Sequence, residues 1–530
     1  NIETTKNNRI PQDEIIIGMT QEPDSLDPVF SQMAASSLIQ GALFEAETER
    51  NEKWDRELRL AEKIPSLKDG DWKILDKKRM ETIWKIKPAS VWEDGHPLTV
   101  FDSLFVHKIY MDPDIPVTSR DVHKRIENIE IIDSYSLRIV WKERYHLADY
   151  GIGFLPSHIL EPVYKSDPKK YHQSFYNKTP IGNGPYKLSK WVSGVEIVLE
   201  KNELFFFDKP FTNKLIFRFI PDSNTLLANL LSGTIDASPP GLGITFDQAI
   251  ELEKQDRKDI KLFFTPGLIW EHIDFNLDNP LLKDKLVRKA LLYAINRKNI
   301  IEKIFFNKVE VAHSWLPPKH YGYYKDVSQY EYNPEKAKEL LIKAGWKWVD
   351  TEKKFYKDNK LIVLTIMTTA GNKLREQVEQ IIQSDFRNIG IELNIKNQPA
   401  NVFFGQTTRY RKFPDLAMYA WVMSPESDGE SLWTSDNIPS KSNNFVGQNT
   451  PGWQNKEIDR IDHLIPQTLD ESERKELFKQ EQIIWSDELP AIPLFFRLDI
   501  SVVRAGFENW LPTGTTNPVS WNCEYWKLIL

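Results

Sequence analysis

The sequence predicts an α/β protein that folds into two or three domains. Its 530 residues are more than one hydrophobic core usually organises. In the second half, an apolar strand at 361–368 is followed by an amphipathic helix at 373–388 and another strand at 391–395. This β-α-β order places the two strands parallel in one sheet. With 41% hydrophobic and 27% charged residues, the composition is that of a globular protein.

The first hundred residues contain three predicted units. Polar residues 1–13 predict a flexible leader, and Ile15 begins the first buried strand. Residues 31–44 have the apolar spacing of a helix. The run from Trp84 to Asp102 predicts a strand, a turn and then a helix that Thr99 caps, with the aspartate in its first turn.

The middle of the chain alternates strands with turns. A hairpin is predicted within residues 126–140, extending to Trp141, and residues 180–186 are too rich in Pro and Gly to be anything but a loop. Strands are expected at 186–191, 196–201 and 214–220, and a helix at 224–232. The later helices are predicted at 283–304, as one helix or two abutting ones, at 334–344, where Asn333 is the N-cap, and at 472–485; a strand follows at 492–496.

Composition excludes several classes of function. The net charge of -7, without a basic block, disfavours nucleic acid as a partner. Cys523 is the only cysteine, so no intrachain disulfide or multi-cysteine metal site can form. No apolar run approaches 18 residues, so no membrane-spanning helix is predicted. The start at Asn1 leaves two alternatives open, a cytosolic protein or one from which an export signal peptide was removed.

Catalytic motifs are missing from the sequence. There is no G-x-S-x-G elbow and no H-E-x-x-H helix, and the glycine pair Gly447 and Gly452 is followed by Trp453 instead of the lysine that a phosphate loop requires. A carboxylate pair such as Glu426 and Asp428 is common in solvated loops. We therefore predict a protein that is not an enzyme, with no catalytic residues, no cofactor and no metal site.

A set of ordered motifs identifies a family. They are Glu22-Pro23 with Leu26-Asp27-Pro28, the block 84–102, Leu155-Pro156-Ser157-His158, the loop 180–186, Ser232-Gly233-Thr234-Ile235-Asp236, Val287-Arg288-Lys289-Ala290, Tyr332-Asn333-Pro334 and Pro490-Ala491-Ile492-Pro493-Leu494. In this order the chain resembles the extracellular solute-binding proteins of the oligopeptide, dipeptide and nickel class, which serve ABC importers. The resemblance covers nearly the whole length.

The resemblance implies a two-lobed periplasmic-binding-protein fold of class II, with an additional small α+β domain on the first lobe. Lobe I would comprise residues 14–45, 180–268 and 498–530, the small domain 46–179, and lobe II 269–497. A solute would be enclosed between the lobes and delivered to a permease in the inner membrane. The protein would be a monomer, periplasmic or anchored to the cell surface as a lipoprotein.

The ligand implied is an oligopeptide or a similar elongated polar solute. The family holds a peptide amine with an aspartate in a segment of the type Gly-Trp-x-x-Asp-Tyr, and here Ser424 takes the place of that aspartate. Glu22, Glu426 or Asp428 could substitute; otherwise the solute is a blocked or modified peptide or a sugar oligomer. The predicted ligand-binding residues are Glu22, Tyr419, Ala420, Trp421, Met423, Ser424, Trp433, Asn444 and Phe495. The alternatives are a hydrolase acting on peptides or oligosaccharides and a ligand sensor without transport.

Overall fold

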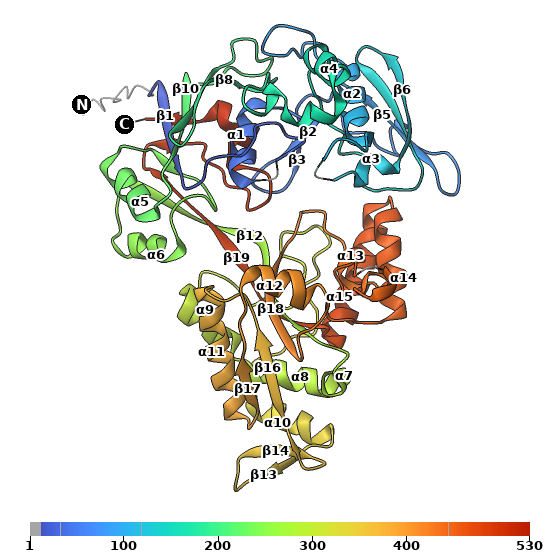
Figure 1. Cartoon of the computed structure of the whole chain (residues 1–530), viewed down its shortest axis with the longest axis vertical. Coiled ribbons are helices and arrows are strands. Elements are labelled where there is room, and N and C mark those ends of the chain that lie inside the picture. The colour runs from blue at the N-terminus through green and yellow to red at the C-terminus, as the bar shows by residue number, and fades with distance from the viewer. Residues whose placement is uncertain (1–11, 32, 118, 444, 530) are drawn as a thin grey trace, which may run out of the picture. The chain divides into compact units, whose positions relative to one another are not determined.

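The computed structural model describes residues 12–529 except 32, 118 and 444 (Figure 1). The chain divides into two compact units, one formed by residues up to 265 together with 499–530, the other by residues 266–498. Two long strands, β12 (Ile260–Phe275) and β19 (Ala491–Arg504), carry the chain from one unit to the other. Residues 1–11 of the predicted leader lie outside the described residues.

The main sheet of the first unit has the strand order β19-β11-β1-β10-β9-β8. Its strands are β1 (Glu14–Met19), β11 (Ala237–Ser238), β10 (Lys214–Phe219), β9 (Glu196–Lys201) and β8 (Tyr186–Val192). Strand β1 is parallel to β10, whereas β9 is antiparallel to both of its neighbours, β10 and β8. Alternate residues such as Ile15 and Ile17 are fully buried in the core, which is why this segment forms a strand in a covered sheet. Helix α1 (Ala34–Leu43) contributes to the same core.

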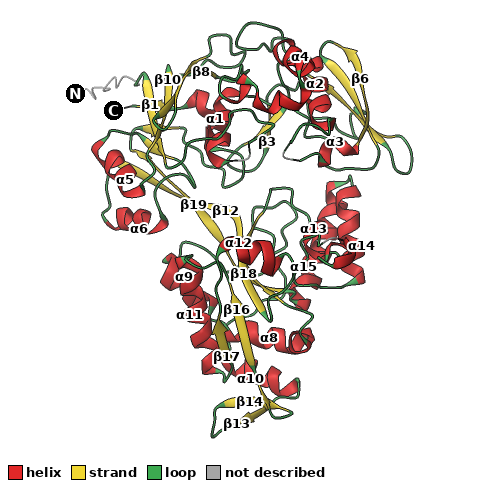
Figure 2. Cartoon of the chain, viewed as in Figure 1, coloured by secondary structure: helices red, strands yellow, loops and turns green. Residues whose placement is uncertain are grey.

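A second, antiparallel sheet of the first unit has the order β4-β5-β7-β6. Its edge strand β6 is labelled in Figure 2. Its strands are β4 (Trp72–Ile74), β5 (Met80–Lys85), β6 (Ile126–Asp133) and β7 (Ser136–Trp141), the last two being the predicted hairpin. The accompanying helices are α2 (Val100–Met111), α3 (Asp121–Arg125) and α4 (Ser157–Ser166). The rest of this unit contains β2 (Thr48–Arg50), β3 (Arg56–Leu58), α5 (Ser223–Ser232), α6 (Phe246–Lys254), β20 (Phe507–Glu508) and β21 (Lys527–Leu528).

Asp102 explains why the block 84–102 is so distinctive in sequence. Its buried carboxylate accepts hydrogen bonds from the backbone N–H of Thr99 at 2.9 Å and from the indole of Trp92 at 3.2 Å. It also accepts from the N–H and hydroxyl of Ser157, at 2.9 and 2.6 Å. Because one carboxylate satisfies donors at the starts of both α2 and α4, it fixes the two helices together. Two of the family motifs are thus structural partners.

The sheet of the second unit has the order β17-β16-β18-β12-β19. Strands β16 (Val363–Met367) and β17 (Glu392–Ile395) are parallel and are connected by helix α11 (Lys373–Asn388), as the β-α-β pattern predicts. Strand β18 (Leu416–Val422) is parallel to β16 and antiparallel to β12. The small sheet β13 (Lys347–Val349), β14 (Lys354–Lys357) and β15 (Lys360–Leu361) belongs to the same unit.

Two helices of the second unit begin at asparagine caps, one of which, Asn333, is predicted from the sequence. The segment predicted at 283–304 is two helices, α8 (Lys285–Ala294) and α9 (Arg297–Phe305), and the side chain of Asn296 caps the second by accepting from the N–H of Asn299 at 3.0 Å. Helix α10 (Pro334–Lys343) is capped by Asn333. The remaining segments are α7 (Pro280–Lys283), α12 (Ala400–Val402), α13 (Glu430–Trp433), α14 (Lys456–Leu464) and α15 (Glu471–Glu488). Helices α13, α14 and α15 form one group (Figure 1).

Within the described residues, every helix is too short or too polar to cross a membrane.

Asp27 and Asp24, three residues apart, have pKa values shifted in opposite directions. Burial raises the pKa of Asp27 to about 7, and the N–H of Val29 only partly offsets this. Partial burial also tends to raise the pKa of Asp24. The hydroxyls of Ser31 and Ser36 donate to its carboxylate, however, and the pKa is lowered overall. A raised pKa in the folded state means that the stabilising contribution of Asp27 is complete below about pH 4 and is lost as the pH rises through about 7.

We therefore expect Asp27→Asn to raise the melting temperature at pH 8, by about 2 °C or more, and to give little gain at pH 5. Thermal unfolding followed by circular dichroism from pH 4 to pH 9 measures the effect. Asp24→Asn is the matched control with the opposite sign, because it removes an acceptor that works when ionised and should lower the melting temperature near neutral pH. Equal effects of Asp27→Asn at both pH values would contradict the expectation.

Candidate functional site

The second half of strand β18 has one open edge. On one side β12 pairs with its whole length, from Phe275 opposite Leu416 to Ile269 opposite Val422. On the other side β16 pairs only with Leu416 and Ala417, and the hydroxyl of Thr368 donates to the carbonyl of Met418 at 2.7 Å. Among the described residues no strand pairs with 419–422 on that side. Such an edge can accept an extended chain through backbone hydrogen bonds.

Tyr419 anchors the face of β18 that carries the aromatic side chains. Its side chain is 3% exposed, and its hydroxyl donates to the carboxylate of Asp274 on β12 at 2.5 Å. The ring of His272 contacts it edge to face at 4.6 Å between centroids. Burial first, and then the charge and hydrogen bond of Asp274, raise the pKa of Tyr419 well above its ordinary value. The tyrosine therefore stays a neutral donor, and its contact with a ligand stays a prediction.

Trp421 and Ala420 are half-buried at the open edge. The Trp421 ring packs edge to face on Tyr419 at 5.6 Å between centroids and lies opposite Trp270 in the pairing. Ala420 lies opposite Glu271 on the other face of the strand. An aromatic plane beside unpaired backbone groups is a surface on which both apolar side chains and amides of a solute can bind.

The loop after β18 closes on itself through two serines. The N–H of Ser424 donates to the hydroxyl oxygen of Ser427 at 2.7 Å, and the N–H of Ser427 returns to the carbonyl of Ser424 at 3.1 Å. The Ser424 hydroxyl also accepts from the N–H of Glu426 at 3.3 Å. Met423 is buried, with its N–H bonded to the carbonyl of Leu268 at 3.0 Å. The Ser424 hydroxyl therefore braces the turn of this loop, and its place at the position of the family's aspartate stays a prediction.

Two further predicted residues are buried in the second unit. Trp433 is 1% exposed and packs edge to face on Trp485 at 5.5 Å. Phe495 is also 1% exposed, with its ring 4.5 Å from that of Phe305. Ligand contact through these side chains stays a prediction. Asn444 lies outside the described residues.

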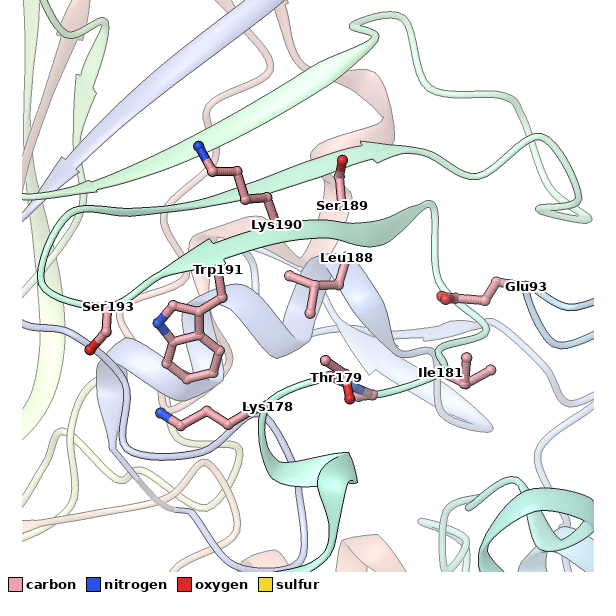
Figure 3. A pocket seen from close by; sticks show the side chains of 10 residues that line it. Glu93, Lys178, Thr179, Ile181, Leu188, Ser189, Lys190, Trp191 and Ser193 are labelled. Carbon is pink, nitrogen blue, oxygen red and sulfur yellow. The ribbon is translucent and has the colours of Figure 1, made fainter.

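Glu22 belongs to the first unit. It is bonded to Trp191, which lines a cavity of about 410 Å³ (Figure 3). Its carboxylate accepts from the indole of Trp191 at 2.8 Å and from the N–H of Gly194 at 2.9 Å. Partial burial acts to raise the pKa of Glu22, but these donors outweigh it and the pKa is lowered. Lys178 lies over the Trp191 ring, 3.6 Å from its centroid, so the ionised Glu22 also faces a cation. As a partner for a ligand amine, Glu22 would have to share its charge with these groups.

Sequence reasoning missed the polar residues on β12 that support this site. Glu271, His272 and Asp274 lie in the second half of β12, where their neighbours are apolar, and all three are buried. Three ionisable residues within four positions of a strand are an available signal, because each needs a partner from a neighbouring element once it is buried. The partners are Arg375 for Glu271 and Tyr419 for Asp274.

We expect Tyr419→Phe to lower the free energy of unfolding by about 1–3 kcal/mol, because the buried carboxylate of Asp274 loses its hydroxyl donor. Urea unfolding at pH 7 measures this. Tyr410→Phe, in a half-buried tyrosine that packs on Phe445, is the matched control and should change stability by no more than about 0.5 kcal/mol. Equal costs for the two variants would show that the Asp274 contact contributes nothing of its own.

Comparison with known proteins places the chain in a family. The model of the family "Bacterial extracellular solute-binding proteins, family 5 Middle" matches residues 64–443. The oligopeptide-binding protein AppA of Bacillus subtilis is 28% identical over 478 residues, which are 89% of this chain and 83% of that protein. An oligopeptide-binding protein of Thermus thermophilus, solved with a pentapeptide, is 30% identical with a TM-score of 0.72, covering 98% of this chain and 97% of that one.

The likeness in fold extends to more distant relatives. The ABC transporter substrate-binding protein CtaP of Listeria monocytogenes is 22% identical and has a TM-score of 0.81, covering 98% of this chain and all of that one. These structures confirm the predicted two-lobed α/β fold. With the family model matching well over half of its length, the chain belongs to the bacterial extracellular solute-binding proteins of family 5.

Proposed function

We propose that this protein is the substrate-binding component of an ABC importer, which binds an oligopeptide or a similar elongated polar solute and delivers it to a membrane permease. The observation that carries the proposal is the open edge of β18 at residues 419–422, beside the half-buried ring of Trp421. An extended peptide bound there would satisfy backbone groups that the protein leaves unpaired. The relatives named for oligopeptide binding support the same solute class.

Ser424 supports a solute whose recognition does not depend on a free amine. A buried ammonium needs a carboxylate partner, and this loop places a hydroxyl at the position where the family motif has an aspartate. The hydroxyl is already engaged with Glu426 and Ser427. Blocked or modified peptides are therefore the solutes we favour, with free-amine peptides bound through their backbone.

We also propose where the protein acts in the cell and how its domains are organised. The protein is exported, without catalytic activity, and acts as a monomer at the membrane surface, with a lipid anchor as the attachment we favour. The two compact units correspond to the two lobes, and residues 46–179 form the small additional domain. Its separate antiparallel sheet supports that assignment.

Backbone pairing can be tested with N-methylated peptides. A pentapeptide library is incubated with the native protein, and the peptide retained best in native mass spectrometry is resynthesised with N-methyl groups at its even or its odd positions. Because alternate N–H groups of an extended chain point to opposite sides, one pattern should weaken binding about tenfold or more relative to the other. Two patterns that bind as well as the parent would contradict pairing at β18, and cleaved peptides would refute the receptor function.

The role of Ser424 is tested with the same peptide carrying a free or an acetylated amine. We expect calorimetry to give dissociation constants within about threefold of each other for the natural protein. Ser424→Asp should favour the free amine by about tenfold, since a carboxylate there supplies the missing charge. Ser427→Asp is the control in the same loop. A strong preference of the natural protein for the free amine would show that another carboxylate replaces the aspartate.

A further inference from the structure

Two carboxyl groups are completely buried between helices α14 and α15. Asp462 and Glu481 are both 0% exposed, and none of their four oxygens receives a hydrogen bond of ordinary geometry. Among the described residues, neither forms an ion pair with Lys, Arg or His. Ionised carboxylates in such a place are strongly disfavoured unless something neutralises them.

The two carboxyl groups converge on one point of the backbone. A methyl group placed on Gly429 would lie 2.6 Å from Oδ2 of Asp462 and 2.8 Å from Oε1 of Glu481. Both oxygens therefore press against the same glycine, where only a hydrogen atom fits between them and the chain. Gly429 connects the loop 424–428 to helix α13, whose residues Leu432 and Trp433 donate their N–H groups to its carbonyl.

The surroundings offer apolar rings and further acids. The ring of Trp433 touches the same point at Gly429, 2.8 Å from the added methyl group, and Trp315 packs on Trp433 with 6.1 Å between centroids. The charged groups that face Asp462 are Asp428, Glu430 and Asp459, all of the same sign. Burial and these neighbours raise the pKa of Asp462. Burial, Asp462 and Asp428 raise the pKa of Glu481, and the indole of Trp315 acts in the other direction.

A single proton resolves this conflict. When one carboxyl is protonated it becomes a donor to the other, which removes one charge and gives the remaining charge a hydrogen-bond partner. A metal ion would need more ligands, and among the described residues no group of three His, Cys, Asp or Glu side chains could hold one. The proton is therefore the neutralising group that the geometry allows.

We propose that Asp462 and Glu481 share one proton and act as positioning residues, which hold Gly429 and the loop 424–428 in the conformation that presents Ser424 to the solute. The link runs from Gly429 back to Ser427, two residues earlier, whose hydroxyl oxygen accepts from the N–H of Ser424 and whose own N–H donates to the carbonyl of Ser424. This inference rests on the proposed solute-binding function only for its effect on affinity. The shared proton itself is independent of any solute.

The proposal sets the sign of a pH effect. Because the folded state binds the proton more tightly than an exposed carboxyl does, the loop is held firmly at low pH and is released as the pH rises through the pKa of the pair. We expect the affinity for a peptide to fall about tenfold as the pH rises through the pKa of the pair. An acetylated, amidated pentapeptide is the probe, because its own ends do not titrate in this range.

The experiment compares the natural protein with Asp462→Asn, Glu481→Gln, Asp462→Ala and Glu476→Gln. Either amide variant supplies a permanent donor to the remaining carboxylate, so the affinity should become independent of pH and stay near its value at low pH. Asp462→Ala should weaken binding at every pH, because alanine removes the hydrogen-bonding group that the amide variants keep. Glu476 lies on the same helix, exposed and paired with Lys479 at 3.1 Å, so its variant should keep the natural pH profile.

Tryptophan fluorescence without solute provides a second readout, because Trp315 and Trp433 adjoin the pair. A change in fluorescence between pH 5 and pH 9 that the natural protein shows and both amide variants lack supports the shared proton. Its absence, or its persistence in those variants, overturns the proposal. A titration with no change in the affinity profile overturns the positioning role alone. If no peptide binds at any pH, the proposed function fails while the fluorescence result still decides the shared proton.

Discussion

The second unit depends on one buried charge, the carboxylate of Glu271 in the middle of strand β12. Burying an ionised carboxylate costs several kcal/mol unless it is paired and hydrogen-bonded. Here Arg375 of α11 donates from Nε and Nη2, at 3.3 and 3.0 Å, and Arg497 of β19 bonds to the same carboxylate. Strand β12 lies between β18 and β19. The cluster therefore fixes helix α11 and strand β19 to β12, the strand that pairs with β18 at the candidate site. A lateral shift of any of the three elements would leave a charge unpaired.

That constraint explains the shape of the site on β18. Ala420 lies directly opposite Glu271, which pairs with the two guanidinium groups. On the opposite face, Tyr419 and Trp421 pack against the Trp270 and His272 side of β12. The Glu271 face of β12 therefore holds the ion cluster, and the half-buried ring of Trp421 and the open edge of β18 form the surface where we propose that the solute binds.

The sequence allowed most of the fold to be predicted, because periodicity and caps act locally. The β-α-β unit of β16, α11 and β17 and the capping of α10 by Asn333 follow from spacing alone. The site was harder, since burial depends on partners far away in sequence. Tyr419 and Trp421 have the same alternation, yet the first is bonded to Asp274 in the core and the second is half-buried at the edge. No local pattern distinguishes these two outcomes.

The buried acids of the second unit are neutralised in two different ways. Glu271 is paired with the guanidinium groups of Arg375 and Arg497, so its charge is neutralised by ion pairs within the protein. Asp462 and Glu481 lie close to other acids and have no guanidinium partner among the described residues, so the proton that we propose they share must come from solvent. The ion pairs of Glu271 hold the sheet of the second unit in one arrangement. A proton pair suits the loop at Gly429, because its free energy can be changed by about 1.4 kcal/mol for each pH unit. The difference in partners therefore separates the rigid part of the unit from the part that can respond to its surroundings.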